Sequence, residues 1–305
     1  MASQGEFDSR LRTAAFEYLR ALELETGGPV RFADVSQFYI DGERITLMDR
    51  QRGIRKPAIL DAALSFRTVH ADRPDQRPYD DAPGPDGYLR YKWRGTDPQH
   101  AENCALRAAF DRELPLIWFH GIQSGWYLPL YPVFLVGEEP GLHQFVVALD
   151  EDQMERWQAV GGDVPTELSR RYANRVVMSR LHQPLFRARV LAAYESRCSV
   201  CNLRHQQLLD AAHIRADRDG GEPVVPNGIS MCKIHHAAYD ANLLGVDPDC
   251  RVVIRPDLLD ERDGPTLRHA LQELHRSSLQ LPRSRAAMPD RDLLAERFEV
   301  FQAAC

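Results

Sequence analysis

Two short motifs, about 30 residues apart, carry the side chains that bind transition metals. Two residues separate Cys198 from Cys201, and Cys232 and His235 repeat that spacing. Each such turn presents two ligands from one side, and two turns complete the tetrahedral ligand set of a structural Zn²⁺ ion. The sequence therefore predicts a structural zinc site at these four residues. Cys250 is the nearest substitute if His235 does not serve as the fourth ligand.

A second set of polar residues accompanies the two metal motifs. His213 ends an apolar stretch that is typical of a strand, Asn227 lies in a Pro-Asn-Gly turn, and His236 directly follows the second motif. A lone histidine among apolar neighbours is usually a core residue, but His213 belongs to this set. Since imidazole has a pKa of about 6.5, a neutral histidine can accept a proton at physiological pH.

This part of the sequence resembles the zinc-containing branch of the HNH endonuclease family, whose site is built on a ββα-metal fold. The resemblance lies within residues 190–256, in Cys-x-x-Cys, Ala-Ala-His-Ile and Asn-Gly-Ile-Ser-Met-Cys-x-x-His-His. It implies that His213 is the general base that activates water and that Asn227 orients this base. It also implies that His236 binds one catalytic divalent ion, Mg²⁺ or Mn²⁺, which stabilises charge on the phosphate and on the leaving oxygen.

The sequence departs from the family pattern at the residue before the base. Many members carry Asp or His there as a metal ligand, whereas this chain has Ala212. Asp210 lies on the same face of the expected strand as Ala212. Asp240, four residues after His236, shares its helical face. We therefore expect Asp210 and Asp240 to supply the missing ligand. If neither of them bound the ion, metal affinity would be poor and the module would not cut DNA.

Residues 1–150 are expected to form a β-rich α+β domain. The pattern predicts a helix over 9–25, a strand over 88–94, a helix from Asp97 to about Glu113, and strands near 115–121, 130–137 and 143–149. The segments 53–57, 78–81, 86–94 and 114–122 resemble N-terminal domains that are fused to HNH modules in restriction enzymes. Such domains look like SRA/PUA-like barrels that read modified bases.

A domain that reads a flipped base needs aromatic walls, hydrogen-bond partners and cations for the flanking phosphates. The resemblance assigns Tyr79, Asp81 and Trp93 to the base, and Arg90 and Lys92 to the phosphates. Trp93 alternates with the basic residues along the expected strand. The alternative therefore stays open that its face is ordinary core and that the basic face is only solvated.

Charge divides the chain near the point where the domains are expected to meet. The net charge is −6, which by itself argues against a nucleic-acid partner, but residues 138–163 alone carry −6. Residues 166–197 carry +5 and are expected to be helical, in two pieces split at Pro184. We therefore predict an acidic linker over 151–164 and an HNH domain with helical flanks over 165–305. Phosphate contacts are expected on the arginines of 170–197, Arg187 and Arg189 among them.

The composition and the start of the chain predict a soluble, cytoplasmic protein. Hydrophobic residues make up 44% of the chain. No stretch reaches the roughly 20 apolar residues of a membrane helix, and the first residues lack the apolar core of a secretory signal.

Together these features predict a modification-dependent restriction endonuclease of the α+β class that acts on DNA carrying modified bases. One HNH site nicks one strand, so cutting both strands predicts a homodimer. Two alternatives remain open. One is a non-catalytic, zinc-stabilised nucleic-acid-binding protein, and the other is an HNH nuclease of toxin or mobile-element type that acts on unmodified DNA.

Overall fold

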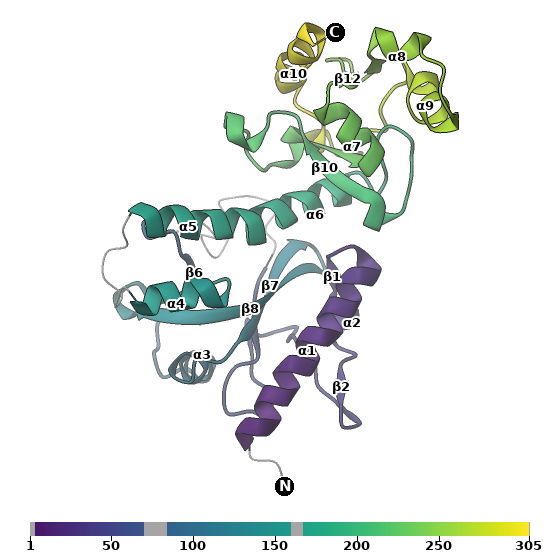
Figure 1. Ribbon diagram of the computed structural model, residues 1–305. Helices are drawn as coiled ribbons and strands as arrows, with labels where there is room; N and C mark the ends of the chain where they lie inside the picture. Colours follow the sequence, from purple (N-terminus) through teal and green to yellow (C-terminus); the bar gives the residue numbers. More distant parts are fainter. Residues whose placement is uncertain (1–3, 70–83, 160–166, 305) are drawn as a thin grey trace. The chain divides into compact units, whose positions relative to one another are not determined.

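The chain folds into two compact units, each with its own hydrophobic core (Figure 1). The computed structural model describes residues 4–69, 84–159 and 167–304. We call Met1–Pro184 the N-terminal unit and Leu185–Cys305 the C-terminal unit. The boundary falls inside helix α6 (Gln183–Ala193) and therefore lies beyond the predicted linker.

The N-terminal unit is built on a seven-stranded sheet, which confirms the expected mixture of helices and strands. Its hydrogen-bonded order is β4-β5-β7-β8-β9-β6, and β1 also pairs with β8. The strands are β1 (Val30–Arg31), β4 (Ile54–Arg55), β5 (Ser65–Thr68), β6 (Leu89–Lys92), β7 (Leu116–Gln123), β8 (Trp126–Glu139) and β9 (Gln144–Ala148). Strand β8 pairs with β7 along its first half and with β9 along its second, and the register shifts within both pairings.

The sheet is curled around an aromatic core. Tyr91 lies on the edge strand β6, and its hydroxyl is 3.4 Å from the carbonyl oxygen of Gly53, beside the opposite edge strand β4. The Tyr91 ring lies 4.5 Å from the Phe66 ring and 6.2 Å from the Trp118 ring, centroid to centroid. All three side chains are buried. The interior of the curled sheet is thus filled by side chains.

Helices cover the sheet of the N-terminal unit. They are α1 (Gln4–Thr26), α2 (Phe32–Val35), α3 (Ala101–Asp111), α4 (Glu151–Ala159) and α5 (Glu167–Val177), and a small hairpin joins β2 (Tyr39–Ile40) to β3 (Glu43–Arg44). Helix α1 buries Leu11, Ala15 and Leu19, which recur every four residues and so share one face. Among the described helices, none has the length and apolar character needed to cross a membrane.

The segment predicted as an acidic linker begins instead with helix α4. The Asp150 carboxylate accepts a hydrogen bond of 2.8 Å from the backbone N–H of Gln153, which is the geometry of an N-cap. Glu151 and Asp152 follow in the first turn, where the helix dipole stabilises acidic side chains. Trp157 then packs on Tyr88, with ring centroids 4.9 Å apart. The acidic run is therefore a helix start rather than a flexible connection.

Two further boundaries differ from the sequence expectation. Helix α3 begins at Ala101 rather than near Asp97, because the Asp97 carboxylate caps a preceding turn by accepting from Gln99 N–H. Pro184 does not separate two helices. A π-helical turn, Met178–His182, joins α5 directly to α6, and Pro184 is the second residue of α6. The helical run therefore continues through Pro184, and the change from π-helical to α-helical geometry falls just before it.

The C-terminal unit places a hairpin against a helix. Its elements after α6 are β10 (Leu209–His213), β11 (Gly228–Cys232), α7 (Lys233–Asp240), β12 (Leu244–Val246), β13 (Val252–Ile254), α8 (Pro256–Asp260), α9 (Pro265–Ala270) and α10 (Arg291–Ala303). Strands β10 and β11 pair antiparallel, and α7 packs on both of them. This is the ββα arrangement that the sequence predicts for the segment.

Candidate functional site

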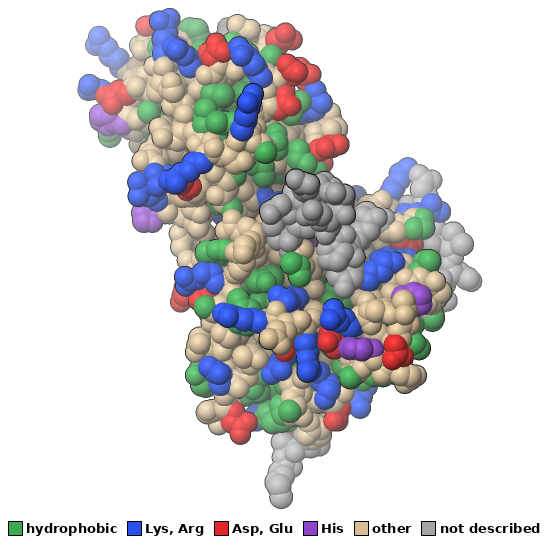
Figure 2. All heavy atoms as spheres, turned by 180° about the vertical axis from the view of Figure 1, so that it is seen from behind, with side chains coloured by type: hydrophobic (Ala, Val, Ile, Leu, Met, Phe, Trp, Pro, Cys, Tyr) green, Lys and Arg blue, Asp and Glu red, His purple; other side chains and the backbone are tan. Residues whose placement is uncertain are grey.

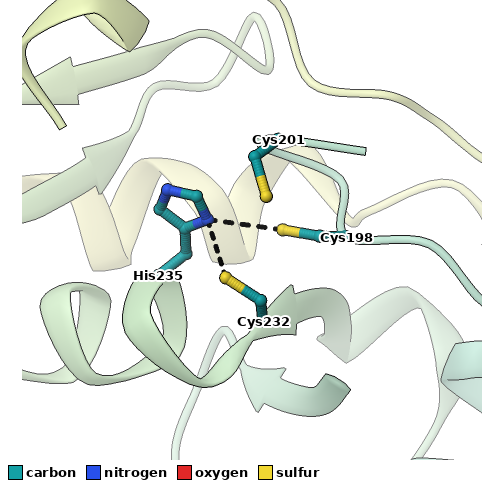
Figure 3. Close-up of side chains that lie close together, drawn as sticks. All are labelled: Cys198, Cys201, Cys232 and His235. Carbon is teal, nitrogen blue, oxygen red and sulfur yellow. Dashed lines mark hydrogen bonds between the residues drawn. The ribbon is translucent and has the colours of Figure 1, made fainter. Parts of the chain in front are cut away.

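Three cysteines and one histidine converge in the C-terminal unit (Figure 3). The donor atoms of Cys198, Cys201, Cys232 and His235 all lie within 4.8 Å of one another, and their side chains point toward a common centre. His235 Nδ1 is 3.4 Å from the Cys198 sulfur and 3.1 Å from the Cys232 sulfur. The two motifs therefore meet as a group that could hold a metal ion, with His235 rather than Cys250 in the fourth position.

The chemistry of this donor set fits zinc. His235 Nε2 lies 2.7 Å from the carbonyl oxygen of Ala270, so Nε2 carries the proton and donates it to this oxygen. The unprotonated Nδ1, which faces the sulfurs, then has a lone pair for a metal ion. Hydrogen bonds from Cys198 and Cys201 lower the pKa of the Cys232 thiol, so the cluster favours a thiolate. One imidazole nitrogen and three sulfurs are a tetrahedral set typical of structural zinc.

The hairpin separates this cluster from the second set of polar residues. Leu209 pairs with Cys232 at one end of the hairpin, and His213 pairs with Gly228 at the other. The cluster therefore anchors the end of β11 and the start of α7, while the opposite end of β10 carries His213. A metal ion in the cluster would stabilise the frame without touching His213.

A buried aromatic side chain holds the ring of His213. Phe186, on α6, stacks on His213 with ring centroids 4.0 Å apart and an interplanar angle of 20°. Burial lowers the pKa of His213 below its usual value, against the opposing effect of Asp217 and other nearby carboxylates. The imidazole is therefore neutral at physiological pH, as a general base requires. The sequence pattern did not indicate Phe186, since nothing distinguishes it from other apolar residues of its helix.

Asn227 is fully buried and closes the loop between the two strands of the hairpin. Its Oδ1 accepts from Arg215 N–H at 2.8 Å, and its Nδ2 donates to the carbonyl oxygens of Arg215 and Glu222 at 3.0 and 2.9 Å. A Cβ atom at Gly221 would lie 1.9 Å from the Arg215 carbonyl oxygen, so the loop closes only around glycine. Asn227 thus fixes the backbone that directly follows His213.

His236 lies between two carboxylates, one beside each ring nitrogen. Asp210 Oδ2 is 3.6 Å from Nδ1, and Asp240 Oδ2 is 3.4 Å from Nε2. The contact with Asp210 raises the pKa of His236, and the charge of Asp240 raises it further against the opposing effect of burial. Burial would raise the pKa of Asp210, but His236 and the Ala211 N–H lower it overall. Imidazole nitrogen with carboxylate oxygen is a donor set suited to a divalent ion.

A cleft of about 800 Å³ opens over these residues. His213, His236 and Asp240 line it, while Asp210 and Asn227 do not. The far wall is α10, which contributes Leu293, Glu296, Arg297 and Val300 from one helical face. Arg215 also lines the cleft. Neither Arg215 nor α10 carries a motif that would have indicated such a position from the sequence.

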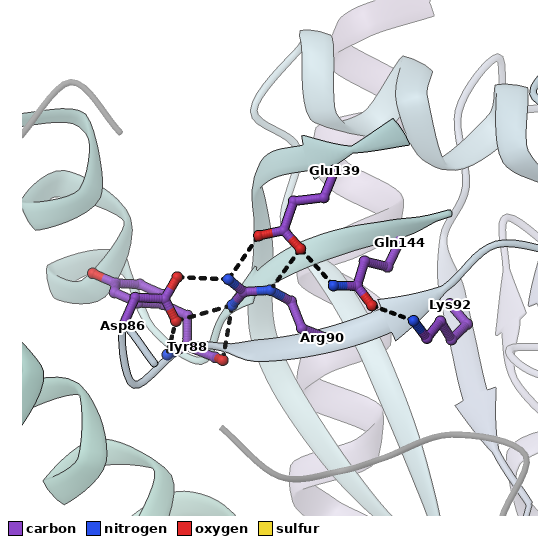
Figure 4. Close-up of polar contacts among 6 residues, drawn as sticks. All are labelled: Asp86, Tyr88, Arg90, Lys92, Glu139 and Gln144. Carbon is purple, nitrogen blue, oxygen red and sulfur yellow. Dashed lines mark hydrogen bonds and ion pairs between the residues drawn. The ribbon is translucent and has the colours of Figure 1, made fainter. Parts of the chain in front are cut away.

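The two cations that were predicted to bind phosphate, Arg90 and Lys92, have partners within the N-terminal unit (Figure 4). Arg90 forms bonds of 2.6 Å to Asp86 and 2.8 Å to Glu139, and Lys92 donates to Gln144 and to a backbone carbonyl oxygen. Trp93 is 5% exposed and therefore belongs to the core, as the alternative interpretation held. Tyr79 and Asp81 lie outside the described residues.

The arginines of residues 170–197 are also engaged in part. Arg187 donates to the carbonyl oxygens of Gln206 and Leu209 and lies 3.7 Å from Asp210, and Arg189 is half-buried on the same helix. Arg180 donates to a carbonyl oxygen within the N-terminal unit. Basic and acidic side chains are interspersed on the face shown in Figure 2. Arg187 thus supports Asp210 and the hairpin from behind.

Part of the C-terminal unit matches a known protein family. Residues 198–247 match the family described as HNH endonuclease. No curated protein matches the chain.

Two solved structures show a distant likeness. A modification-dependent TagI restriction endonuclease is 18% identical with a TM-score of 0.29, over 82% of this chain and 85% of its own. The Type IV phosphorothioation-dependent restriction endonuclease ScoMcrA is 14% identical with a TM-score of 0.26, over 62% of this chain and 48% of its own. These scores are too low to support an argument about this chain. The family match carries the identification: residues 198–247, with their ββα frame and cysteine-histidine cluster, form an HNH endonuclease domain, and the protein is a nuclease.

Proposed function

We propose that the protein is a divalent-metal-dependent DNA endonuclease that hydrolyses phosphodiester bonds in the cleft of its C-terminal unit. The observation that carries this proposal is that His213, His236 and Asp240 line one cleft within the segment that matches the HNH family. A plasmid-nicking assay with added Mg²⁺ or Mn²⁺ tests it. The assay uses plain plasmid and plasmid that carries modified cytosines or phosphorothioate linkages. Conversion of any of these from supercoiled to open-circular form supports the proposal, and it is refuted if all of them stay intact with both ions.

The side chains divide the reaction between them. His213, neutral and held by Phe186, accepts the proton of the attacking water. Asn227 keeps the following backbone in place and so orients His213. His236 would hold a divalent ion, which would supply charge stabilisation for the phosphate and the leaving oxygen. A Zn²⁺ ion in the cysteine-histidine cluster is proposed as structural only.

The two carboxylates beside His236 take different parts in this proposal. One ion binds only one nitrogen of an imidazole ring, and Asp210 and Asp240 approach opposite nitrogens. Asp240 lines the cleft and Asp210 does not. We therefore assign Nε2 and Asp240 to the ion, while the Asp210 carboxylate, 3.6 Å from Nδ1, pairs with that side of the ring and orients it. Such carboxylate–histidine pairs are common behind metal ligands.

Conservative substitutions distinguish these parts. We expect Asp240→Asn to weaken Mn²⁺ binding by more than about 100-fold, because a charged ligand is lost, whereas loss of a group that only supports a ligand typically costs about 10- to 100-fold. Asp210→Asn should weaken binding by about 10-fold, at the lower end of that range, since its amide oxygen still faces Nδ1. Titration calorimetry with Mn²⁺ on the zinc-loaded protein measures both. A larger loss of affinity in Asp210→Asn than in Asp240→Asn would show that Asp210 is the ligand. If neither variant changed the affinity for Mn²⁺, the ion would not bind at His236.

We further propose that the N-terminal unit reads modified DNA and directs the nuclease, which would cut both strands as a homodimer. Support comes from its β-rich, curled sheet and from the sequence resemblance to domains of the SRA/PUA-like type. The interior of the sheet is filled by Phe66, Tyr91 and Trp118. A flipped base would therefore have to bind at the margin of the sheet rather than inside it.

Cleavage of matched substrates tests the reading function. Duplexes of one sequence carry 5-methylcytosine, 5-hydroxymethylcytosine, a phosphorothioate linkage or no modification. We expect one modified duplex to be cut at least about ten times faster than the plain one, which corresponds to about 1.4 kcal/mol of discrimination. Equal rates on all four would indicate a nuclease that acts on unmodified DNA.

A further inference from the structure

The loop after β10 delivers a guanidinium group to the nuclease cleft. Arg215 lies two residues beyond His213, and Asn227 binds both its backbone N–H and its carbonyl oxygen. The backbone of Arg215 is therefore fixed relative to His213. Its side chain is 38% exposed and lines the cleft. Because its backbone is fixed and its side chain can exchange one partner for another, Arg215 is suited to bind an anion that enters the cleft.

In the structure, Glu296 of α10 occupies this guanidinium. The Glu296 carboxylate pairs with the terminal nitrogen of Arg215 across the cleft and is 58% exposed. An ion pair between exposed side chains contributes little to stability, because water and salt screen the two charges. A phosphate group can replace it at little cost, because guanidinium binds phosphate through strong, charge-assisted hydrogen bonds.

Helix α10 holds Glu296 rigidly in front of Arg215. The backbone N–H of Asp290, its N-cap, donates to the Pro226 carbonyl oxygen at 2.9 Å, beside the Asn227 turn. At the other end, Phe301 is so close to Gly245 that a Cβ atom there would lie 2.6 Å from its ring. The helix is thus fastened at both ends, and the carboxylate does not depend on a flexible tail.

The other arginines that line the cleft have different environments. Arg297 donates to Asn242 Oδ1 at 2.7 Å, and its guanidinium lies 4.5 Å from the centre of the Tyr239 ring, so it holds α10 in place. Arg218 is 87% exposed and lies 3.6 Å from its sequence neighbour Asp219. Arg215 differs from both, because it lies two residues after His213 and its partner, Glu296, comes from helix α10.

We propose that Arg215 binds a backbone phosphate of the nucleic acid in the cleft, and that Glu296 competes with this phosphate and so restrains binding. The inference rests on the proposed function, since it takes the cleft as the DNA site. Glu296 then lowers the affinity for any duplex equally, because a phosphate contact carries no base sequence. The carboxylate would limit binding of DNA that the N-terminal unit has not selected.

A double-mutant cycle on DNA binding tests this coupling. Zinc-loaded protein without added Mg²⁺ or Mn²⁺ is titrated into a fluorescent, unmodified duplex, and anisotropy gives the dissociation constant. We expect Arg215→Gln to weaken binding about 10-fold and to make the salt slope shallower by about one. Glu296→Gln should tighten binding about 3- to 10-fold in the parent chain. In the Arg215→Gln background it should change nothing.

Matched controls separate the pair from general electrostatics. Glu299→Gln removes the same charge from an exposed position of the same helix that does not line the cleft, and it should change binding less than two-fold in either background. Tightening by Glu296→Gln that persists without Arg215, or equal tightening by Glu299→Gln, would overturn the inference. Thermal melting and zinc content confirm that each variant is folded. Arg215→Lys, which keeps the charge, should recover part of the affinity.

The nicking assay with added Mg²⁺ or Mn²⁺ is read separately from this cycle. A wild-type protein that nicks DNA but shows no coupling between the two residues refutes the inference and leaves the proposed function intact. Coupling in binding without nicking supports the phosphate site and refutes the nuclease activity.

Discussion

Replacing His213 with alanine is expected to reduce DNA cleavage by about 10³-fold, within the range that a general base contributes. The imidazole is the group in the cleft that is both neutral, because burial lowers its pKa, and held in orientation by Phe186. Single-turnover nicking of plasmid measures the rate of the chemical step. DNA binding and zinc content should stay unchanged, because His213 lies at the opposite end of the hairpin from the cysteine-histidine cluster.

The exposed His205 provides a matched control for this substitution. It lies in the same unit, before β10, and does not line the cleft. His205→Ala should cleave DNA at the wild-type rate. If His213→Ala cleaved at that rate too, His213 would not be the general base and the mechanism proposed here would be wrong.

Loss of the proposed zinc ion is expected to unfold the C-terminal unit while the N-terminal unit stays folded. Binding of a structural Zn²⁺ ion contributes about 10–16 kcal/mol in small zinc domains, more than a unit of this size holds in reserve. Cys232 joins the end of β11 to the start of α7, so Cys232→Ala should release both. Hydrogen exchange measured by mass spectrometry should show loss of protection throughout residues 198–260.

Tryptophan fluorescence reports the N-terminal unit separately. All four tryptophans, Trp93, Trp118, Trp126 and Trp157, precede the C-terminal unit. Their emission should therefore remain native in the Cys232→Ala protein. Cys250→Ala is the control, because Cys250 lies outside the cluster; it should retain one zinc ion per chain and full protection. Zinc retention and native exchange in Cys232→Ala would exclude a structural zinc site at this cluster.

The sequence by itself determined the frame of the nuclease domain. The two metal motifs, His213, Asn227 and His236 all lie within about 40 residues, and their roles depend on one hairpin and one helix. Local spacing therefore suffices to place them: a strand ends at His213, a turn carries Asn227, and a helix begins inside the second metal motif, between Cys232 and His235. The family match over 198–247 confirms that this segment is an HNH endonuclease domain, while the roles of the single residues stay predictions.

The tertiary structure decided which of several chemically equivalent side chains meet. His235 rather than Cys250 completes the cluster, because α7 starts directly at Cys232 and turns Nδ1 toward the sulfurs. Asp210 and Asp240 both flank His236, but the strand places one behind the ring and the helix places the other in the cleft. Spacing along the chain cannot distinguish such positions, since Asp210 fits the alternation of a strand and Asp240 fits the spacing of a helix equally well.

The same limit applies to contacts between distant segments. Glu296 reaches Arg215 across 81 residues of chain, and the acidic run after Asp150 is a helix start because Trp157 packs on Tyr88. The sequence shows that Arg215 is a cation, Glu296 an acid and Trp157 an aromatic residue. Which residues they contact depends on how separate elements pack. The sequence thus indicated the HNH domain and the residues to which its chemistry is assigned, while packing between elements decided which of these side chains face the cleft and which pair with other groups inside the fold.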